Sequence, residues 1–232
     1  MSVFFAIKNY VQNTVGRMIR ETGLELDRWG SKFQRDIACW EPLSRHRNIL
    51  PLYDKIPTFY SNAFISPNCT LIGDVFLGQN TSIGYGSTLR ADLNPIRVGH
   101  NTNIGDKTVI SNVDTLPSGI PTSTTIGNNV NIEDNVVLQS CIIDDFVTIG
   151  ISSIVLEGSQ LERGCVIAPN SFVPAGHLIP AYQLWGGSPV RYIRDLTTEE
   201  KQQYFKKQEE NFQIGKQNKE ALLLTGYNPT SQ

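Results

Sequence analysis

The residues of this chain that are best able to do chemistry are three histidines and four cysteines. The histidines are too far apart in the sequence to match the short spacings of metal-binding motifs. The cysteines form neither a CxxC pair nor a disulfide framework, so we interpret them as reduced, buried thiols in a reducing compartment. These residues are His46, His100 and His177, and Cys39, Cys69, Cys141 and Cys165.

His100 and His177 are the candidates if the chain is an acyltransferase, because that chemistry uses a histidine as general base on an acceptor hydroxyl. No motif that would orient such a base stands beside either residue, and we interpret both as corner residues. The third histidine lies in the basic triplet Arg45-His46-Arg47. A solvated surface explains such a triplet, and contact with anionic lipid head groups or with a partner's carboxylates is the alternative.

The element that must position these side chains is a hexapeptide repeat between Ile65 and Leu178. Aliphatic residues return there at sixth positions, with few breaks, and six is neither a strand period nor a helix period. Each hexad is therefore a short strand plus a corner, and three hexads close one triangular coil. The repeating residues are Ile65, Leu71, Leu77, Ile83, Leu89, Val98, Ile104, Ile110, Ile126, Ile132, Leu138, Ile143, Ile149, Val155, Leu161, Ile167 and Val173.

The residues between the aliphatic positions support this interpretation. Gly, Asn and Asp recur where tight corners need turn or left-handed backbone, as in Gly105-Asp106. Small residues such as Thr81 and Ser87 precede the next aliphatic residue by two. This pattern is the signature of a left-handed parallel β-helix, so we expect a mainly β fold.

The repeat is interrupted once, between Asn112 and Thr125, where two prolines and a glycine oppose regular strand pairing. A long excursion from a solenoid is often a binding segment. Its only acidic residue is Asp114. We therefore do not expect a metal-binding loop there.

Before the repeat, apolar residues recur in steps of three or four from Ser2 to Phe33, which predicts an amphipathic helix. Gly16, Gly23 and Gly30 are spaced by seven along it, although a glycine inside a helix costs about 0.8–1 kcal/mol relative to alanine. We interpret them as a close contact with another helix, in a membrane or beside it. The alternative is a helix that breaks at one glycine and packs on its own β-helix. The first twenty residues, which contain basic but no acidic side chains, are similar to a mitochondrial import sequence, and an ordinary amphipathic helix is the alternative.

After the repeat, the segment from Leu184 to Arg191 is expected to end the prism. Thr197-Thr198-Glu199-Glu200 has the spacing of a capping box, which predicts a helix that continues to about residue 224 along the prism. The expected organisation is an N-terminal helix and linker over 1–57, a β-helix over 58–187, and a C-terminal helix and tail over 188–232.

Composition excludes several classes of protein. A chain of 232 residues is long enough for one solenoid domain with appendages. Its net charge of −2 does not suggest a nucleic-acid surface, so we expect no nucleic-acid partner. The apolar runs are too short to span a bilayer.

Several motifs together give the chain a family resemblance. The string Leu89-Arg90-Ala91-Asp92 and the Trp-Gly-Gly-Ser-Pro-Val-Arg close resemble those of γ-class carbonic anhydrases. The leader motifs Ile-Arg-Glu-Thr-Gly and Leu-Ser-Arg-His-Arg are similar to those of the γ-carbonic anhydrase subunits of mitochondrial respiratory complex I. The resemblance covers about residues 10 to 200.

The resemblance implies a trimer of prisms with a zinc site at each subunit interface, held by three histidines from two subunits. The matching positions in this chain are Ser111, Asp134 and Gln139, so every imidazole is replaced. Zinc prefers nitrogen and thiolate donors, whereas a hydroxyl, one carboxylate and an amide form a weak oxygen set. We therefore expect no zinc cofactor at this chain's own positions, and no catalysis.

The residues by which the family joins its subunits are retained. Arg90 and Asp92 stand two apart on a strand, and so on one face. They and Asp106 match the family's trimer-interface positions. Gly105 stands where the family often has glutamine, which further weakens a catalytic interpretation.

The leading hypothesis is a structural subunit of a heterotrimer with other γ-carbonic anhydrase-type subunits. It would lie peripherally on the matrix side of the mitochondrial inner membrane, against membrane-arm subunits of complex I. The three leader glycines and the basic triplet are its expected membrane-arm or partner contacts. Two enzymatic alternatives remain: an active γ-carbonic anhydrase in which Glu133 and Asp134 hold a metal, and a hexapeptide acyltransferase.

Overall fold

The computed structural model divides into two compact units, Met1–His46 and Arg47–Gln232. The predictions for Cys39 and for the triplet Arg45-His46-Arg47 fall outside the residues that the structure describes. The described residues are 15, 16, 18, 19, 21–23, 25, 26, 29, 30, 33, 48–52, 54–60, 62–115 and 122–224.

In the first unit, the described residues between 15 and 33 are helical, as the apolar periodicity predicts. Apart from chain neighbours and the backbone of the same helix, no described atom lies within 4 Å of the position that a Cβ would take at Gly16, Gly23 or Gly30. Within the described part of the chain, no helix is long and apolar enough to cross a membrane. The large apolar side chains of this helix are exposed: Val15, Met18, Ile19, Leu26, Trp29 and Phe33.

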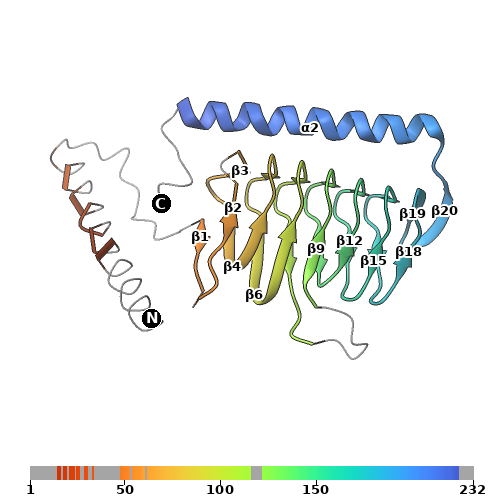
Figure 1. The fold of residues 1–232 in the computed structure, drawn as a ribbon, viewed down its shortest axis with the longest axis horizontal. Helices are drawn as coiled ribbons and strands as arrows, with labels where there is room; N and C mark the ends of the chain where they lie inside the picture. The colour runs from red at the N-terminus through yellow and green to blue at the C-terminus, as the bar shows by residue number, and fades with distance from the viewer. Residues whose placement is uncertain are drawn as a thin grey trace, which may run out of the picture. The chain divides into compact units, whose positions relative to one another are not determined.

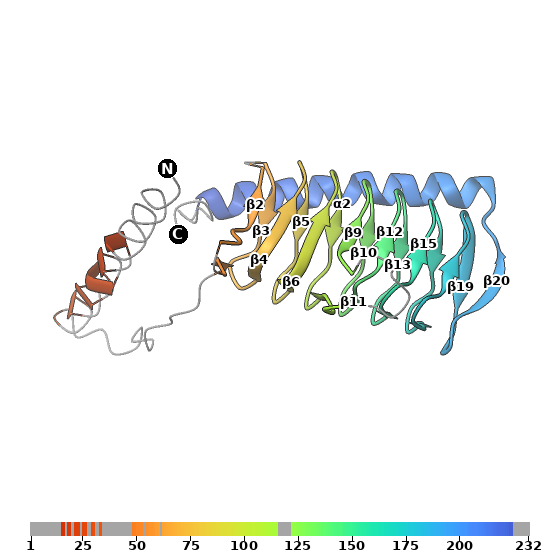
Figure 2. The ribbon, with the colours of Figure 1, turned by 60° about the horizontal axis from the view of Figure 1, so that its bottom comes forward.

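The second unit is a parallel β-helix whose coils have three faces (Figures 1 and 2). The first face contains β1 (Ile49–Leu50), the first halves of β4 (Thr70–Leu77) and β6 (Thr88–Val98), β8 (Val109–Ser111), β11 (Val137–Gln139), β14 (Ile154–Val155) and β17 (Phe172–Val173). The second face contains β2 (Thr58–Phe59), the second halves of β4 and β6, β9 (Thr124–Ile126), β12 (Ile142–Ile143), β15 (Gln160–Leu161) and β18 (Leu178–Ile179).

The third face is a separate sheet. It contains β3 (Phe64–Ile65), β5 (Ser82–Ile83), β7 (Asn103–Ile104), β10 (Asn131–Ile132), β13 (Thr148–Ile149), β16 (Val166–Ile167), β19 (Gln183–Gly186) and β20 (Arg191–Asp195). All pairs in the prism are parallel except the last, between β19 and β20.

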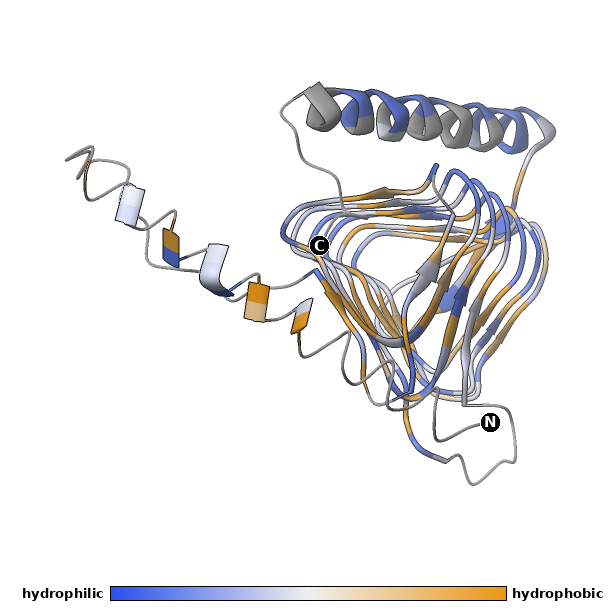
Figure 3. Cartoon of the chain, turned by 60° about the vertical axis from the view of Figure 1, so that its left-hand side comes forward, coloured by the Kyte–Doolittle hydropathy of each residue, from blue (hydrophilic) through white to orange (hydrophobic). Residues whose placement is uncertain are grey.

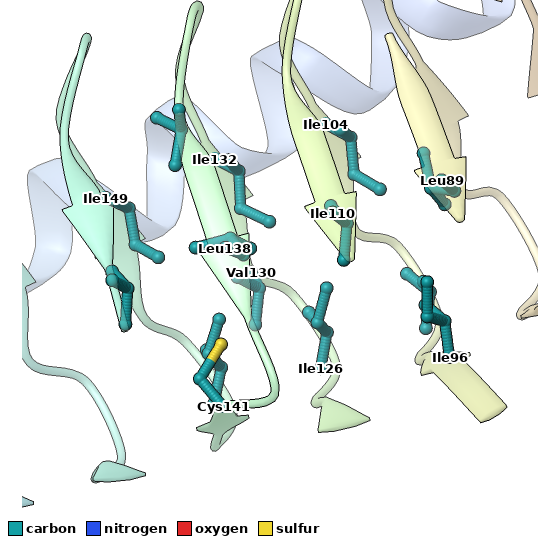
Figure 4. Packing of buried hydrophobic residues seen from close by; sticks show 14 of the residues in the cluster. Leu89, Ile96, Ile104, Ile110, Ile126, Val130, Ile132, Leu138, Cys141 and Ile149 are labelled. Atoms are coloured by element: carbon teal, nitrogen blue, oxygen red, sulfur yellow. The ribbon is translucent and has the colours of Figure 1, made fainter. Parts of the chain in front are cut away.

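The core lies along the axis of the coils, as the hexad pattern predicts. Every aliphatic residue of the predicted repeat from Ile65 to Val173 is buried. Figure 4 shows side chains such as Leu89, Ile110 and Leu138 in the interior of the coils, with Cys141 among them. Removing these side chains from water is the main stabilising contribution in such a solenoid. Each coil contacts only its neighbours, so the contribution adds up coil by coil along the prism.

The residues at the corners of the coils also adopt the backbone conformations that the hexad pattern predicts. Asn101 and Asn129 adopt φ angles of 52° and 54°, the left-handed backbone that asparagine tolerates better than most residues. The buried small residues satisfy the corner backbone: the Ser87 hydroxyl donates to the carbonyl of Gly105 at 2.7 Å. These contacts join the corner backbone of one coil to side chains of the next.

Both ends of the prism extend beyond the expected 58–187. At the start, β1 pairs with Leu71 and Ile72 of β4, so part of the expected linker is a strand. At the other end, the segment expected only to close the prism turns back, and β20 pairs antiparallel with β19. These strands satisfy the backbone groups of the terminal coils that would otherwise be left unpaired.

Helix α2 (Thr198–Leu224) covers the third face, where it packs against β3 and β7. Figure 3 shows the triangular outline of the coils with this helix along one side. The predicted capping box is present: the Glu200 carboxylate accepts from the N–H of Thr197, whose hydroxyl accepts from the N–H of Glu200. A Cβ at Gly215 would lie 3.0 Å from the Cβ of Ser82, so this glycine permits close packing of the helix on the sheet.

Candidate functional site

Ser111 and Gln139 lie side by side on the first face. They end β8 and β11 and are paired in the parallel register. Arg90 of β6 pairs with Ser111 and continues the row. Because alternate residues of a strand point to opposite sides, and Ile110 and Leu138 point into the core, this row points outward. The structure thus brings together two of the three expected ligand positions.

Asp134 lies at another edge of the prism, at the corner between β10 and β11. Its Oδ1 accepts a hydrogen bond from the backbone N–H of Asp106 at 2.8 Å. Oδ1 of Asp106 in turn accepts from the N–H of Tyr85 at 2.7 Å. These carboxylates tie successive coils together at their corners. Within one chain, Asp134 is therefore separated from Ser111 and Gln139 and already has a backbone partner.

A groove of about 220 Å³ runs between this corner and helix α2. Gly215 and Asn218 of α2 form one side of it, and Asp106 and Asp134 lie on the other. Among the described residues, no group of three His, Cys, Asp or Glu side chains could hold a metal ion. The groove is lined by Phe64, Ser82, Gly84, Tyr85, Asn103, Ile104, Gly105, Asp106, Asp134, Gly215 and Asn218.

Gly105 lies at a close approach between two successive coils. A Cβ there would lie 2.6 Å from Oδ1 of Asp134 and 2.6 Å from the backbone carbon of Glu133. A glutamine, the residue that the resemblance leads one to expect, would not fit this corner without moving the next coil. Gly105 and Asp134 therefore form one close-packed unit.

The three ligand-equivalent residues do not fit a zinc ion. Ser111 and Gln139 offer neutral oxygens, whereas catalytic zinc sites use three firm nitrogen, thiolate or carboxylate ligands. The one carboxylate, Asp134, is directed at a backbone N–H of its own chain. Two neutral oxygens and one carboxylate carry too little negative charge, and are too hard as donors, to keep zinc bound in competition with water.

Arg90 and Asp92 pair with each other. Nε of Arg90 donates to Oδ2 of Asp92 at 2.8 Å, and the side chains are 60% and 18% exposed. Burial opposes ionisation of Asp92, but the hydrogen bonds from Arg90 and from the N–H of Leu93 outweigh it, so the pKa of Asp92 is lowered. Asp92 therefore stays charged, and most of the Arg90 side chain remains accessible.

Lys55 is a neighbour of this pair that sequence reasoning missed. Its Nζ donates to the backbone carbonyl of Asp92 at 2.6 Å and to that of Leu93 at 3.0 Å. The contact fixes the segment before β2 against the corner of β6. No sequence motif marks it, because Lys55 lies outside the repeat and its acceptors are backbone atoms.

Neither described histidine is arranged as a general base. His100 lies at a corner, as predicted, and its Nδ1 accepts from the N–H of Gln79 at 2.8 Å. His177 lies just before β18, and its ring packs edge-on against Trp185, with 5.5 Å between centroids. Its Nε2 is buried. A base needs an accessible lone pair, which Nδ1 of His100 and Nε2 of His177 do not offer here.

The three described cysteines are buried thiols, as predicted. Burial raises the pKa of Cys69 to about 11 and those of Cys141 and Cys165 to about 12. Thiols of this kind are protonated at neutral pH and make poor nucleophiles and poor metal ligands.

Known proteins similar to this chain include a carbonic anhydrase and a hexapeptide transferase family protein. No protein-family model matches the chain. It is 40% identical over 187 residues to the mitochondrial γ-carbonic anhydrase 2 of Arabidopsis thaliana, over 81% of this chain and 67% of that protein. A hexapeptide transferase family protein from Anaplasma phagocytophilum has a similar structure, with a TM-score of 0.67 and 33% identity over 72% of this chain and 95% of the other.

A second solved structure is that of a putative acetyltransferase from Bacillus cereus. It superposes with a TM-score of 0.71 and 29% identity, over 75% of this chain and 97% of the other. The parallel β-helix of hexapeptide repeats is therefore shared with proteins whose names point to acyl transfer as well as to carbonic anhydrases. The fold alone does not choose between these activities.

Proposed function

Because the chain belongs to the γ-carbonic anhydrase family, we propose that it is a non-catalytic member that serves as an assembly subunit. It would form a trimer with sister subunits of the same family on the matrix side of the membrane arm of mitochondrial complex I. It would have no zinc at its own ligand-equivalent positions.

The proposal that the chain is non-catalytic rests on the residues at its three ligand-equivalent positions. Ser111 and Gln139 are neutral, and Asp134 accepts the N–H of Asp106. Hydration of CO₂ by a zinc enzyme needs a bound water whose pKa is brought near 7, and that needs a firmly held metal. The residues present do not provide such a site.

The assembly part rests on what the chain retains. Arg90 is largely exposed on the first face beside Asp92, and Asp106 is exposed at the corner. The Arabidopsis thaliana relative named above is a mitochondrial protein, which supports a mitochondrial location. The exposed apolar side chains and the glycines of the N-terminal helix would supply the contact with the membrane arm.

A test is to delete the protein in its own cells and restore it in two forms. The wild-type chain and a triple variant, Ser111→Ala with Asp134→Asn and Gln139→Ala, should restore the same amount of assembled complex I on native gels. Retained assembly with the triple variant supports a structural role. Loss of bicarbonate formation with assembly intact would instead point to catalysis, and a wild-type chain that migrates as a free monomer away from complex I would contradict the assembly role.

Acyl transfer is the second candidate, and the similarity to the acetyltransferase structure favours it. It would require a base such as His100, but Nδ1 of this residue is occupied by the N–H of Gln79. Purified chain incubated with acetyl-CoA and amine or hydroxyl acceptors should release no more CoA than a His100→Ala variant. Release that depends on His100 would favour this second function.

A further inference from the structure

The outward residues of the third face, on the side that helix α2 covers, are polar in four successive coils. They stand at the same position in each coil and are paired in register. Ser82, Asn131 and Thr148 are 9%, 1% and 4% exposed. Helices that cover parallel sheets usually bury apolar side chains, so α2 gains less from this contact than such helices do. The polar row is Ser82, Asn103, Asn131 and Thr148, with Phe64 and Val166 at its two ends.

Hydrogen bonds join this polar row only in part. Oγ of Ser82 donates to Oδ1 of Asn103 at 2.5 Å, and Nδ2 of Asn103 donates to Oδ1 of Asn131 at 3.2 Å. Oγ1 of Thr148 is buried and has no hydrogen-bond partner among the described residues. Nearly all buried polar groups of native proteins are hydrogen-bonded, and one without a partner destabilises the packing around it. The middle of the contact between α2 and the prism is therefore weak.

The start of α2 is firmly attached to the end of the prism. Nη2 of Arg194, in β20, donates to Oε1 of Glu200 at 2.5 Å, and the capping box joins Glu200 to Thr197. The ammonium group of Lys201 lies 4.4 Å from the centroid of the Tyr182 ring. All of these contacts involve only the first turn of α2. They can persist if the rest of the helix moves away from the sheet.

A second attachment lies in the second half of α2. Gly215 is buried against Ser82, since a Cβ at Gly215 would lie 3.0 Å from the Cβ and 3.4 Å from Oγ of Ser82. The helix packs there against the coils of β3 and β7 (Figures 1 and 3). The groove of about 220 Å³ lies beside this contact, with Asp106 and Asp134 on its other side. Separation of Gly215 from Ser82 would open the groove and expose the polar row.

The prism does not need α2 to complete its own sheets. The strands of the third face from β5 to β16 each pair with a strand on both sides, and the aliphatic core lies inside the coils. The polar row can be hydrated when the helix leaves it. Helix α2 has 27 residues, which exceeds the length of about 12–15 below which isolated helices are marginal. Both parts can therefore keep their structure when they separate.

We propose that α2 is a hinged lid over the third face. It pivots near Thr197, and its second half detaches at the contact between Gly215 and Ser82 while the prism stays folded. The open lid exposes the groove beside Asp106 and Asp134 to solvent. This inference is independent of the proposed assembly function, because it concerns a motion within one chain.

Hydrogen exchange of the full chain, in the assembly in which it is purified, tests the lid. In the wild type, peptides from the second half of α2 should exchange through an opening that depends little on urea, because the opening exposes little apolar surface. Peptides from β10 and β13 should exchange only on global unfolding.

Gly215→Leu should open the lid. Leucine favours a helix more than glycine does, so α2 itself is not weakened, but its side chain does not fit against Ser82. Exchange in the second half of α2 should rise about tenfold, as expected for an overpacked contact, and exchange in the first turn should not change. Gln217→Leu is the matched control, because Gln217 is exposed on the same helix, and it should exchange as the wild type does.

Thr148→Val should act in the opposite direction. It replaces a buried hydroxyl by a methyl group of the same shape, so exchange in α2 should slow several-fold. Thr125→Val makes the same change at an exposed position of the second face and should leave α2 exchange unchanged. The inference is overturned if α2 and the strands of the prism exchange at one rate with one urea dependence, or if either Gly215→Leu or Thr148→Val exchanges as the wild type does. A chain that does not associate with complex I would contradict the assembly role and leave these exchange rates as predicted.

Discussion

Gln139 lies beside Ser111 in the parallel register of β11 and β8, and both side chains are half-buried on the outward side of the first face. In the γ-carbonic anhydrase family these two positions are expected to contribute ligands to the same metal ion. We propose that the backbone here keeps the frame of a two-ligand half-site, while Ser111 and Gln139 offer only neutral oxygens. Whether this backbone still suits a metal site can be tested by placing histidines at the ligand-equivalent positions.

Histidines at positions 111, 134 and 139 should restore zinc binding. We predict that Ser111→His, Asp134→His and Gln139→His together give an assembled trimer that retains close to one zinc per interface after dialysis against a weak chelator. The wild type should retain almost none, because imidazole nitrogen is a far better zinc donor than a hydroxyl or an amide. Zinc is measured by elemental mass spectrometry.

The single variant Ser111→His is the control for the triple variant, and it should stay as empty as the wild type. A wild-type trimer that keeps a full complement of zinc would contradict both the prediction and the proposed non-catalytic role.

Gly105 should not tolerate a side chain. The Cβ of a Gly105→Ala variant would lie 2.6 Å from both Oδ1 of Asp134 and the backbone carbon of Glu133. Overpacking of this kind costs about 1–3 kcal/mol. Urea unfolding should show this decrease in the free energy of unfolding.

Adding Asp134→Ala to Gly105→Ala separates the two contacts. The double variant relieves the side-chain contact but not the backbone contact, so stability should recover only in part. Full recovery would show that the backbone of the next coil is less tightly packed than the structure indicates.

The hexad pattern identified the core well because the inward positions are read from residue type alone. Leu89, Ile110 and Leu138 can each fill a narrow axis only as aliphatic side chains, and all three are fully buried. The pattern omitted Val75 and Ile96, which are equally buried. They stand at positions where most hexads carry a small residue.

The corner contacts were harder to predict. The hydrogen bond from the N–H of Asp106 to Asp134 joins residues 28 apart, across a coil lengthened by the 112–125 excursion. The sequence shows that an acidic residue stands at this corner, but it does not show which backbone N–H donates a hydrogen bond to its carboxylate. The strand β20 was missed for a related reason, because its pairing with β19 is decided by how the terminal coil is closed.

Glu200 should make the start of helix α2 sensitive to acid. The hydrogen bonds from Arg194, and then that from the N–H of Thr197, lower the pKa of Glu200 from 4.5 to about 2. A carboxyl whose pKa is lower in the folded state stabilises that state above its unfolded pKa. This contribution should therefore be complete above pH 4.5 and lost as the pH falls from 4.5 to about 2.

Hydrogen exchange of peptides from the first turns of α2 measures this effect. Exchange in the wild type should accelerate across that pH range. A Glu200→Gln variant should exchange faster at neutral pH and change less on acidification, because its side chain does not titrate. Equal pH dependence in the two proteins would show that Glu200 does not anchor the helix.

The thiol of Cys141 should report opening of the prism. Burial raises its pKa to about 12, and the side chain is fully inaccessible in the core. Because the thiolate is the reactive form, a disulfide reagent at pH 8 should label Cys141 only when the coils separate. In a variant with Cys39→Ser, Cys69→Ser and Cys165→Ala, the labelling rate should rise with urea in step with unfolding followed by circular dichroism. The same variant in concentrated urea supplies the labelling rate of an exposed thiol, and labelling of Cys141 at that rate in the native protein would contradict a closed core.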